Sequence, residues 1–252
     1  MSARPRIAII GDGNVGSALL EGWRRTGHDV EAVGNEPERV RQLAHEADLI
    51  VLAVPFGQRF NAVDEMGEDI DGKVLVDVTN ALDDSYGFAA TFDRSGAEDL
   101  QERAPGARVV KAFNTVFAQN MSRGTVLGEP LTVLVAGDDE AAKETVMGLA
   151  RAIGFDGLDA GPIANARWLE ALGFLNIQLG FGQKLGSDIG FRVVRKETAR
   201  MRSARREMRG RADKSTRARS RAKVEAPARR SQRSNTRAGS RARSAKASTR
   251  KT

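Results

Sequence analysis

The chain has 252 residues, of which 40% are apolar and none is cysteine, with 40 basic and 33 acidic side chains. This length allows one full-sized core or two modest domains, and the lack of cysteine excludes disulfides, zinc–thiolate sites, iron–sulfur clusters and thiol nucleophiles. No apolar run reaches the roughly 18 residues that a membrane-spanning helix needs, and the N-terminal residues have no apolar signal-peptide core. We therefore expect a cytoplasmic protein with no membrane partner and no metal site.

The charges are divided unequally along the chain. Residues 195–252 hold 22 Lys and Arg against four acids, whereas residues 1–194 hold 18 basic and 29 acidic side chains. The body is therefore acidic and the C-terminal segment strongly basic. Ser, Thr, Ala and Arg replace nearly all apolar residues in 195–252, so this segment cannot bury enough surface to offset its ordering entropy. We predict that 195–252 is a disordered, basic tail.

The body alternates between two kinds of apolar pattern. Short Val-, Ile- and Leu-rich runs predict strands at 6–10, 28–33, 48–54, 73–78, 108–112, 131–136 and 155–160. Apolar residues at helical spacing predict helices after the first strand, from Pro37 to about Glu46, and from about Asp139 to Ile153. Such alternation is typical of a doubly wound α/β fold, in which helices cover both faces of a parallel sheet.

A long apolar segment follows this pattern at 166–185. Its apolar residues lie all around the expected helix, which is unusual for a helix at the surface. We expect it to be buried, in the core or in a dimer interface.

The first strand ends in a glycine motif, Gly11-Asp12-Gly13-Asn14-Val15-Gly16. A GxGxxG sequence between a strand and a helix is the fingerprint of Rossmann dinucleotide-binding domains. Gly11 permits the tight turn, Gly13 lets the backbone approach a pyrophosphate, and Gly16 lets helix and strand pack closely. The alternative is a glycine turn that binds no ligand.

The end of the second strand indicates which dinucleotide is preferred. Domains that prefer NAD place Asp or Glu there to bind the ribose 2′-hydroxyl, but this chain has Gly34 followed by Asn35. A carboxylate would repel the 2′-phosphate of NADP, and Arg39 follows one helical turn later. We therefore predict NADP, although Glu36 lies nearby and Arg39 could simply belong to a solvated helix face.

The chain offers few groups for acid–base catalysis. Its two histidines, His28 and His45, fall in a turn opposite the expected cofactor edge and on a polar helix face. Oxidation of an alcohol needs a general base, most often histidine, whereas hydride transfer between two cofactors needs mainly positioning. The composition favours the second type of reaction.

Several further motifs occur in a characteristic order. They are GDGNVGSAL, VLAVPF, DVTNAL, KAFNT, VAGDDEAA, DAGP and ARWLEAL, and the resemblance that they carry covers about residues 6–194. In this order they resemble the NADP-dependent reductases of the deazaflavin coenzyme F420. Related dinucleotide-binding domains occur in membrane metalloreductases and in pyrroline-5-carboxylate reductase.

The resemblance implies a role for each matching residue. Gly11, Asp12, Gly13, Asn14, Val15 and Gly16 would surround the pyrophosphate, with Asn35 and Arg39 at the 2′-phosphate. Val54, Pro55 and Phe56 would line the nicotinamide, with Thr79 and Asn80 at its ribose. Ala112, Phe113 and Asn114 would lie where the second cofactor stacks, with Asn114 the one candidate catalytic residue. Thr79, Asn80 and Asn114 also suit loops and helix caps without any ligand.

These observations predict a Rossmann NADP-binding domain at 1–161, a helical segment at 162–194 for the second substrate or a homodimer interface, and the tail at 195–252. The predicted activity is hydride transfer between NADP(H) and F420 or a flavin-like acceptor. One alternative is a non-catalytic dinucleotide sensor whose tail binds nucleic acid without sequence specificity. Another, an enzyme like pyrroline-5-carboxylate reductase, leaves little chain for its second domain. The hydride acceptor and the direction of reaction stay open.

Overall fold

The computed structural model describes residues 4–91 and 93–196. Apart from Arg195 and Lys196, the predicted disordered tail lies outside the described residues. The described part of the chain up to Val194 belongs to one compact unit, which is called the body below.

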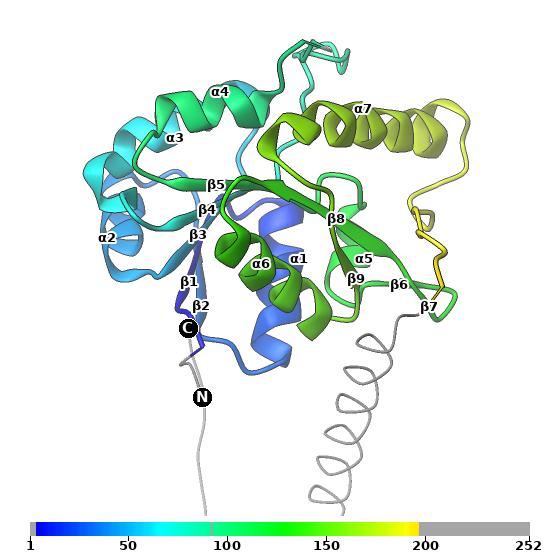
Figure 1. Ribbon diagram of the computed structural model, residues 1–252, viewed down its shortest axis with the longest axis horizontal. Coiled ribbons are helices and arrows are strands. Elements are labelled where there is room, and N and C mark those ends of the chain that lie inside the picture. The colour runs from blue at the N-terminus through cyan, green and yellow to red at the C-terminus, as the bar shows by residue number, and fades with distance from the viewer. Residues whose placement is uncertain (1–3, 92, 197–252) are drawn as a thin grey trace, which may run out of the picture. The chain divides into compact units, whose positions relative to one another are not determined.

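The body is built on a seven-stranded sheet in the order β2-β1-β3-β4-β5-β8-β9 (Figure 1). The strands are β1 (Ile7–Ile10), β2 (Val30–Val33), β3 (Leu49–Leu52), β4 (Val74–Asp77), β5 (Arg108–Lys111), β8 (Thr132–Gly137) and β9 (Asp156–Asp159). Neighbours are parallel except β5 and β8, which pair antiparallel. The predicted doubly wound α/β fold is confirmed, with this one antiparallel pairing as a correction to an all-parallel sheet.

Helices cover both faces of the sheet because its strands are apolar on both sides. The helices are α1 (Asn14–Arg25), α2 (Pro37–Glu46), α3 (Arg59–Met66), α4 (Gly96–Arg103), α5 (Ala118–Met121), α6 (Glu140–Ala152) and α7 (Ala166–Ile177). In β1, Ile7 and Ile9 join the apolar cluster beneath α1 and α6, whereas Ala8 and Ile10 join the cluster beneath α2, α3 and α4. Figure 1 shows these two layers of helices on opposite sides of the sheet.

Two short helices were not predicted from the sequence. Both α3 and α4 are only eight residues long, and α4 starts at a capping box that Ser95 and Glu98 form. The Ser95 hydroxyl accepts the Glu98 amide while the Glu98 carboxylate accepts the Ser95 amide. Such reciprocal bonds satisfy two donors at a helix start that would otherwise have no partner.

The apolar segment at 166–185 forms α7 and a following π-helical turn, Gln178–Gly182. Within the single chain it is not buried on all sides, because Trp168 is 58% exposed, Leu175 49% and Phe181 64%. The opposite side of α7 lies over the sheet and includes buried Leu169 and Glu170. The predicted helix is present, but its exposed apolar residues are not buried in the core of this chain, so burial in a dimer interface stays a prediction.

Candidate active site

The turn after β1 has the conformation that its glycines were predicted to allow. Gly11 has φ +109°, and a Cβ atom there would lie 2.3 Å from the Ala53 carbonyl oxygen. A Cβ atom on Gly16 would lie 1.9 Å from the Gly11 carbonyl oxygen. Both positions therefore require glycine for packing alone.

Gly13 differs from the other two glycines of the motif. A Cβ atom there would meet no atom of the protein within 4 Å, and the backbone is extended with φ −67°. Packing does not require glycine at this position, but a ligand approaching the N-terminus of α1 would. The free N–H groups of that helix start are suited to bind an anion such as pyrophosphate.

Two clefts open at the carboxyl ends of the strands and share Ala53, Val54 and Pro55. The first, of about 400 Å³, is lined by Val15, Ala53, Val54, Pro55, Phe56, Gly57, Val78, Thr79, Asn80, Leu82, Asp83, Asp84 and Tyr86. The second, of about 480 Å³, is lined by Ile10, Gly11, Asp12, Gly13, Gly34, Asn35, Val40, Ala53, Val54, Pro55, Gln58, Asn61, Ala62 and Glu65. Here the chain order reverses on either side of β1, and ligands of open α/β sheets bind at such switch points.

The clefts bring together most of the predicted site residues. Val15, Val54, Pro55, Phe56, Thr79 and Asn80 line the first cleft, which we call the nicotinamide cleft. Gly11, Asp12, Gly13 and Asn35 line the second, which we call the ribose cleft. Asn14, Gly16, Arg39, Ala112, Phe113 and Asn114 line neither cleft.

A buried ionic cluster supports the loop that carries Thr79 and Asn80. The Lys111 ammonium donates to the Asp77 carboxylate at 2.9 Å and to the Thr79 carbonyl oxygen at 2.9 Å. It also pairs with Glu170 of α7 at 3.1 Å. The side chains of all three charged residues are 0% exposed. We call Asp77, Lys111 and Glu170 the Lys111 cluster.

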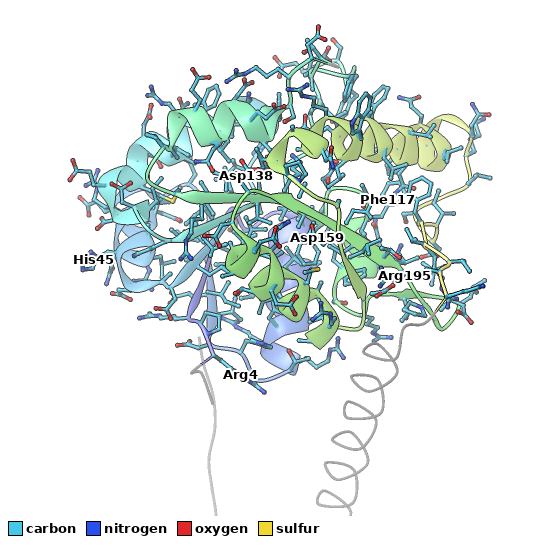
Figure 2. All side chains as sticks on the ribbon, viewed as in Figure 1. Arg4, His45, Phe117, Asp138, Asp159 and Arg195 are labelled. Atoms are coloured by element: carbon cyan, nitrogen blue, oxygen red, sulfur yellow. The ribbon has the colours of Figure 1, made fainter. Side chains whose placement is uncertain are left out.

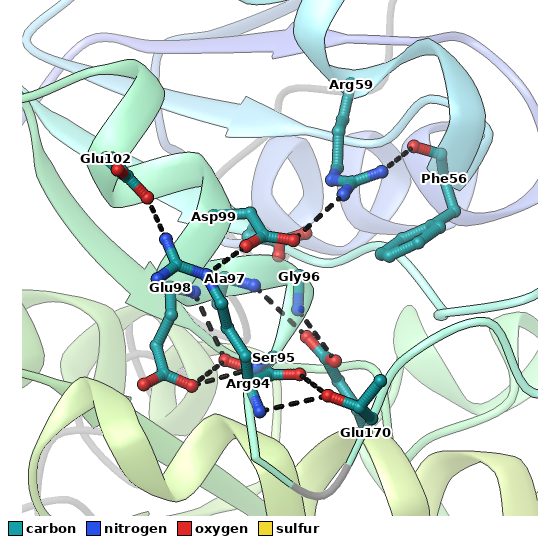
Figure 3. A network of polar contacts seen from close by, with 12 residues as sticks. Phe56, Arg59, Arg94, Ser95, Gly96, Ala97, Glu98, Asp99, Glu102 and Glu170 are labelled. Atoms are coloured by element: carbon teal, nitrogen blue, oxygen red, sulfur yellow. Dashed lines mark hydrogen bonds and ion pairs between the residues drawn. The ribbon is translucent and has the colours of Figure 1, made fainter.

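Glu170, the acidic residue that α7 contributes to the cluster, also accepts hydrogen bonds from the start of α4. Figure 3 shows the Glu170 carboxylate beside the backbone amides of Gly96 and Ala97, which donate to it at 3.0 and 3.2 Å. Burial lowers the pKa of Lys111, but the charges of Asp77 and Glu170 outweigh it, so that the pKa lies above its usual value. Sequence reasoning gave these residues no role, although they lie within the DVTNAL, KAFNT and ARWLEAL motifs.

A second contact between the same helices is more exposed. Arg167 of α7 donates to Glu98 of α4 at 2.6 and 2.8 Å. These bonds, together with those from Ser95, lower the pKa of Glu98 to about 2. The carboxylate of Glu98 therefore stays ionised, and α7 stays bonded to α4, throughout the neutral range.

Known proteins resemble this chain in sequence and in fold. A sequence profile described as NADP oxidoreductase, coenzyme F420-dependent, matches residues 6–81. The F420-dependent NADP reductase of Methanothermobacter marburgensis is 30% identical over 161 residues, which are 61% of this chain and 71% of that reductase. The chain belongs to the F420-dependent NADP reductase family. It is an NADP-dependent oxidoreductase.

Two further relatives support this assignment. A crystal structure named as an F420-dependent NADP reductase, from Arthrobacter sp. FB24, is 29% identical with a TM-score of 0.70, and the match covers 76% of this chain and all of that one. Metalloreductase STEAP3 of Rattus norvegicus is 30% identical over 180 residues, which are 67% of this chain but 36% of the metalloreductase. None of these matches supports the alternative of a non-catalytic sensor. No helix among the described residues is long and apolar enough to cross a membrane.

In this reductase, the three residues predicted beside the second cofactor, Ala112, Phe113 and Asn114, are buried and do not line either cleft. Phe113 is 1% exposed, with Trp23 and Phe155 edge-on to its ring. Asn114 is also buried, and its amide donates to the Leu169 carbonyl oxygen of α7 at 2.8 Å. Asn114 is therefore placed to hold α7 against the sheet, and Phe113 to pack in the apolar cluster beneath α1 and α6.

Arg39 does not face the ribose cleft of the reductase. Its guanidinium pairs with Glu31 of β2 and donates to Gln42 of α2 at 2.8 Å. The alternative that Arg39 belongs to a solvated helix face agrees better with this geometry than the predicted contact with a 2′-phosphate.

Both histidines lie away from the two clefts. Figure 2 shows His45 at the outer side of α2, where it pairs with Asp69 at 2.8 Å. His28 lies before β2, at the opposite end of the strands from the clefts, and its ring is within 2.9 Å of the Thr26 hydroxyl. Burial and the charge of Arg4 lower the pKa of His28. Neither position allows direct proton transfer in the clefts.

Proposed function

We propose that this reductase transfers a hydride between the nicotinamide of NADP(H) and coenzyme F420 or a related flavin-like acceptor, with the reacting rings in the nicotinamide cleft. One observation carries the proposal: the inner lining of that cleft has no ionisable side chain. Its ionisable residues, Asp83, Asp84 and Tyr86, belong to an exposed segment at the rim. A site without an acid or base suits a reaction whose redox chemistry belongs to the two cofactors.

The residues present fit a nicotinamide dinucleotide. Gly13 leaves open space at the N-terminus of α1, where the pyrophosphate would bind. The Thr79 hydroxyl and the Asn80 amide oxygen are buried without a hydrogen-bond partner. Unpaired buried polar atoms are costly, and the hydroxyls of the nicotinamide ribose could satisfy these two. Val54, Pro55 and Phe56 would then hold one side of the nicotinamide ring.

When bound, the dinucleotide would supply a hydride, and the chain would position it. Val54 and Pro55 would exclude water from one side of the ring, and Thr79 and Asn80 would hold the ribose. The Lys111 cluster holds the Thr79–Asn80 loop, and Asn114 keeps α7 over the sheet. Correct orientation of two bound reactants can supply most of the rate acceleration of such a reaction.

Anaerobic turnover with several acceptors tests the proposal. NADPH oxidation should be rapid with F420, slower with FMN or FAD, and close to the uncatalysed rate with pyrroline-5-carboxylate. Asn80→Ala should lower the rate with F420 by roughly tenfold, through lost orientation. Asp29→Asn, a change at the other end of the sheet, is the control and should leave the rate unchanged. NADPH that binds but reduces none of these acceptors would refute the proposal.

We further propose that the segment 162–194 forms a homodimer interface through the exposed apolar residues of α7 and of the chain just after it. Trp168 and Leu175 on α7, Phe181 in the π-helical turn and Leu185 beyond it are each about half exposed or more, and single chains seldom expose so many large apolar residues along one segment. A twofold axis would pair this surface with itself. Leu175→Glu should convert the dimer to a monomer in light scattering. Leu127→Glu, at a residue that is 100% exposed in a turn outside this segment, should not. An equal mass for both variants and the wild type would count against this interface.

The basic segment 195–252 supports a separate proposal, that it binds nucleic acid without sequence specificity in the cytoplasm. Its 22 basic and four acidic residues would release counterions from the phosphates, so binding should weaken steeply with salt. In gel shifts, full-length protein should retard DNA at low salt and a protein ending at Lys196 should not. Both should bind NADPH alike. Full-length protein that ignores DNA at low salt would leave the segment without this role.

A further inference from the structure

The carboxyl end of β2 holds a carboxylate that does not come from β2. Gly34 is the position where NAD-preferring domains place Asp or Glu. A Cβ atom on Gly34 would lie 3.1 Å from each carboxylate oxygen of Asp12. The Asp12 side chain, from the glycine turn, therefore reaches the space that a carboxylate on residue 34 would occupy.

The other charges of the ribose cleft also disfavour a 2′-phosphate at this position. The described residues that line the ribose cleft include two acids, Asp12 and Glu65, but no Lys or Arg. Arg39, the basic residue predicted to meet a 2′-phosphate, is paired with Glu31 instead. Asn35, which also lines the cleft, can donate to either a hydroxyl or a phosphate and so does not distinguish them.

We infer that Asp12 is a specificity-determining residue, which makes this reductase accept NADH as well as NADPH. Its carboxylate accepts a hydrogen bond from the ribose 2′-hydroxyl of NADH and repels the doubly charged 2′-phosphate of NADPH. The inference rests on the proposed function only in placing the adenine ribose at the ends of β1 and β2. It reverses the expectation from Gly34 alone, because the missing carboxylate of β2 is supplied by the neighbouring turn.

Equilibrium titration of the full chain with NADPH and with NADH, followed by fluorescence, tests the inference. The wild type should bind both dinucleotides with similar affinity. Asp12→Asn keeps the shape but removes the charge, and it should raise the ratio of NADPH to NADH affinity by roughly tenfold or more, as expected for two charges a few ångströms apart near a protein surface. Asp29→Asn makes the same change in net charge at a side chain that is 78% exposed at the other end of β2, and it should leave the ratio unchanged.

A double variant tests whether a carboxylate at this place is sufficient, whichever residue carries it. Asp12→Asn combined with Gly34→Asp returns one carboxylate to this place from β2, so the ratio should fall back to the wild-type value. A ratio that Asp12→Asn does not move, or a wild type that binds NADPH a thousandfold better, would overturn the inference while leaving the proposed function intact. Failure of the wild type to bind either dinucleotide would instead refute the proposed function.

Discussion

Gly13→Ala should weaken NADPH binding by at least about tenfold, or about 1.4 kcal/mol, while leaving the free energy of unfolding nearly unchanged. The added methyl group meets no protein atom within 4 Å, and the extended backbone at Gly13 is one that alanine adopts readily. The methyl group should instead collide with the bound pyrophosphate, which must approach the backbone of residue 13 closely. Fluorescence titration and urea unfolding of the same preparation measure both quantities.

Gly16→Ala is the matched comparison within the same motif. Its methyl group would lie 1.9 Å from the Gly11 carbonyl oxygen, so the turn and helix must shift, and overpacking of this kind costs about 1–3 kcal/mol of stability. Gly13→Ala should therefore lower NADPH affinity, whereas Gly16→Ala should lower the free energy of unfolding. If Gly13→Ala binds NADPH as the wild type does, the turn is not the pyrophosphate site.

Lys111→Met should lower the free energy of unfolding by about 3–5 kcal/mol, since it leaves Asp77 and Glu170 buried without their cation. The support for the Thr79 carbonyl oxygen is lost as well, so the KM for NADPH should rise. Urea unfolding measures the first effect and steady-state kinetics the second. Arg103→Met breaks an exposed pair with Asp64 and should cost less than about 1 kcal/mol. A loss that small at Lys111 would contradict the role of the cluster.

The raised pKa of Lys111 also determines how its contribution to stability depends on pH. Because the folded pKa lies above the usual 10.5, the stabilisation from protonated Lys111 is fully present below the unfolded pKa. It is lost as the pH rises through the folded value. The difference in stability between the wild type and Lys111→Met should therefore shrink only in strongly alkaline solution.

The parts of the fold that depend on local pattern could be predicted from the sequence. The Val- and Ile-rich strands and α2, predicted from Pro37 to Glu46, are present as expected, because apolar periodicity and proline act over a few residues. The antiparallel pairing of β5 with β8 was not predicted, since strand direction depends on long-range topology. Which side of α7 packs on the sheet could not be predicted either, because apolar residues occur all around this helix.

In the candidate site too, local features could be predicted from the sequence and long-range contacts could not. Gly11 and Gly16 could be assigned from the motif, because their role is a local backbone requirement. The approach of Asp12 to Gly34 and the pairing of Lys111 with Glu170 could not, since each joins segments far apart in the chain. The pairing of Arg39 with Glu31 was also missed, although only eight residues separate them, because it depends on how α2 packs beside β2.

Deuterium transfer from NADPH labelled at C4 of the nicotinamide tests the central claim most directly. The reductase would be mixed anaerobically with the labelled dinucleotide and F420 in ordinary water, and the reduced F420 examined by mass spectrometry. Direct hydride transfer in the nicotinamide cleft predicts one deuterium per reduced F420 from one of the two labelled C4 positions and none from the other. Reduced F420 without deuterium from either position, or no reduction despite tight NADPH binding, would contradict the account.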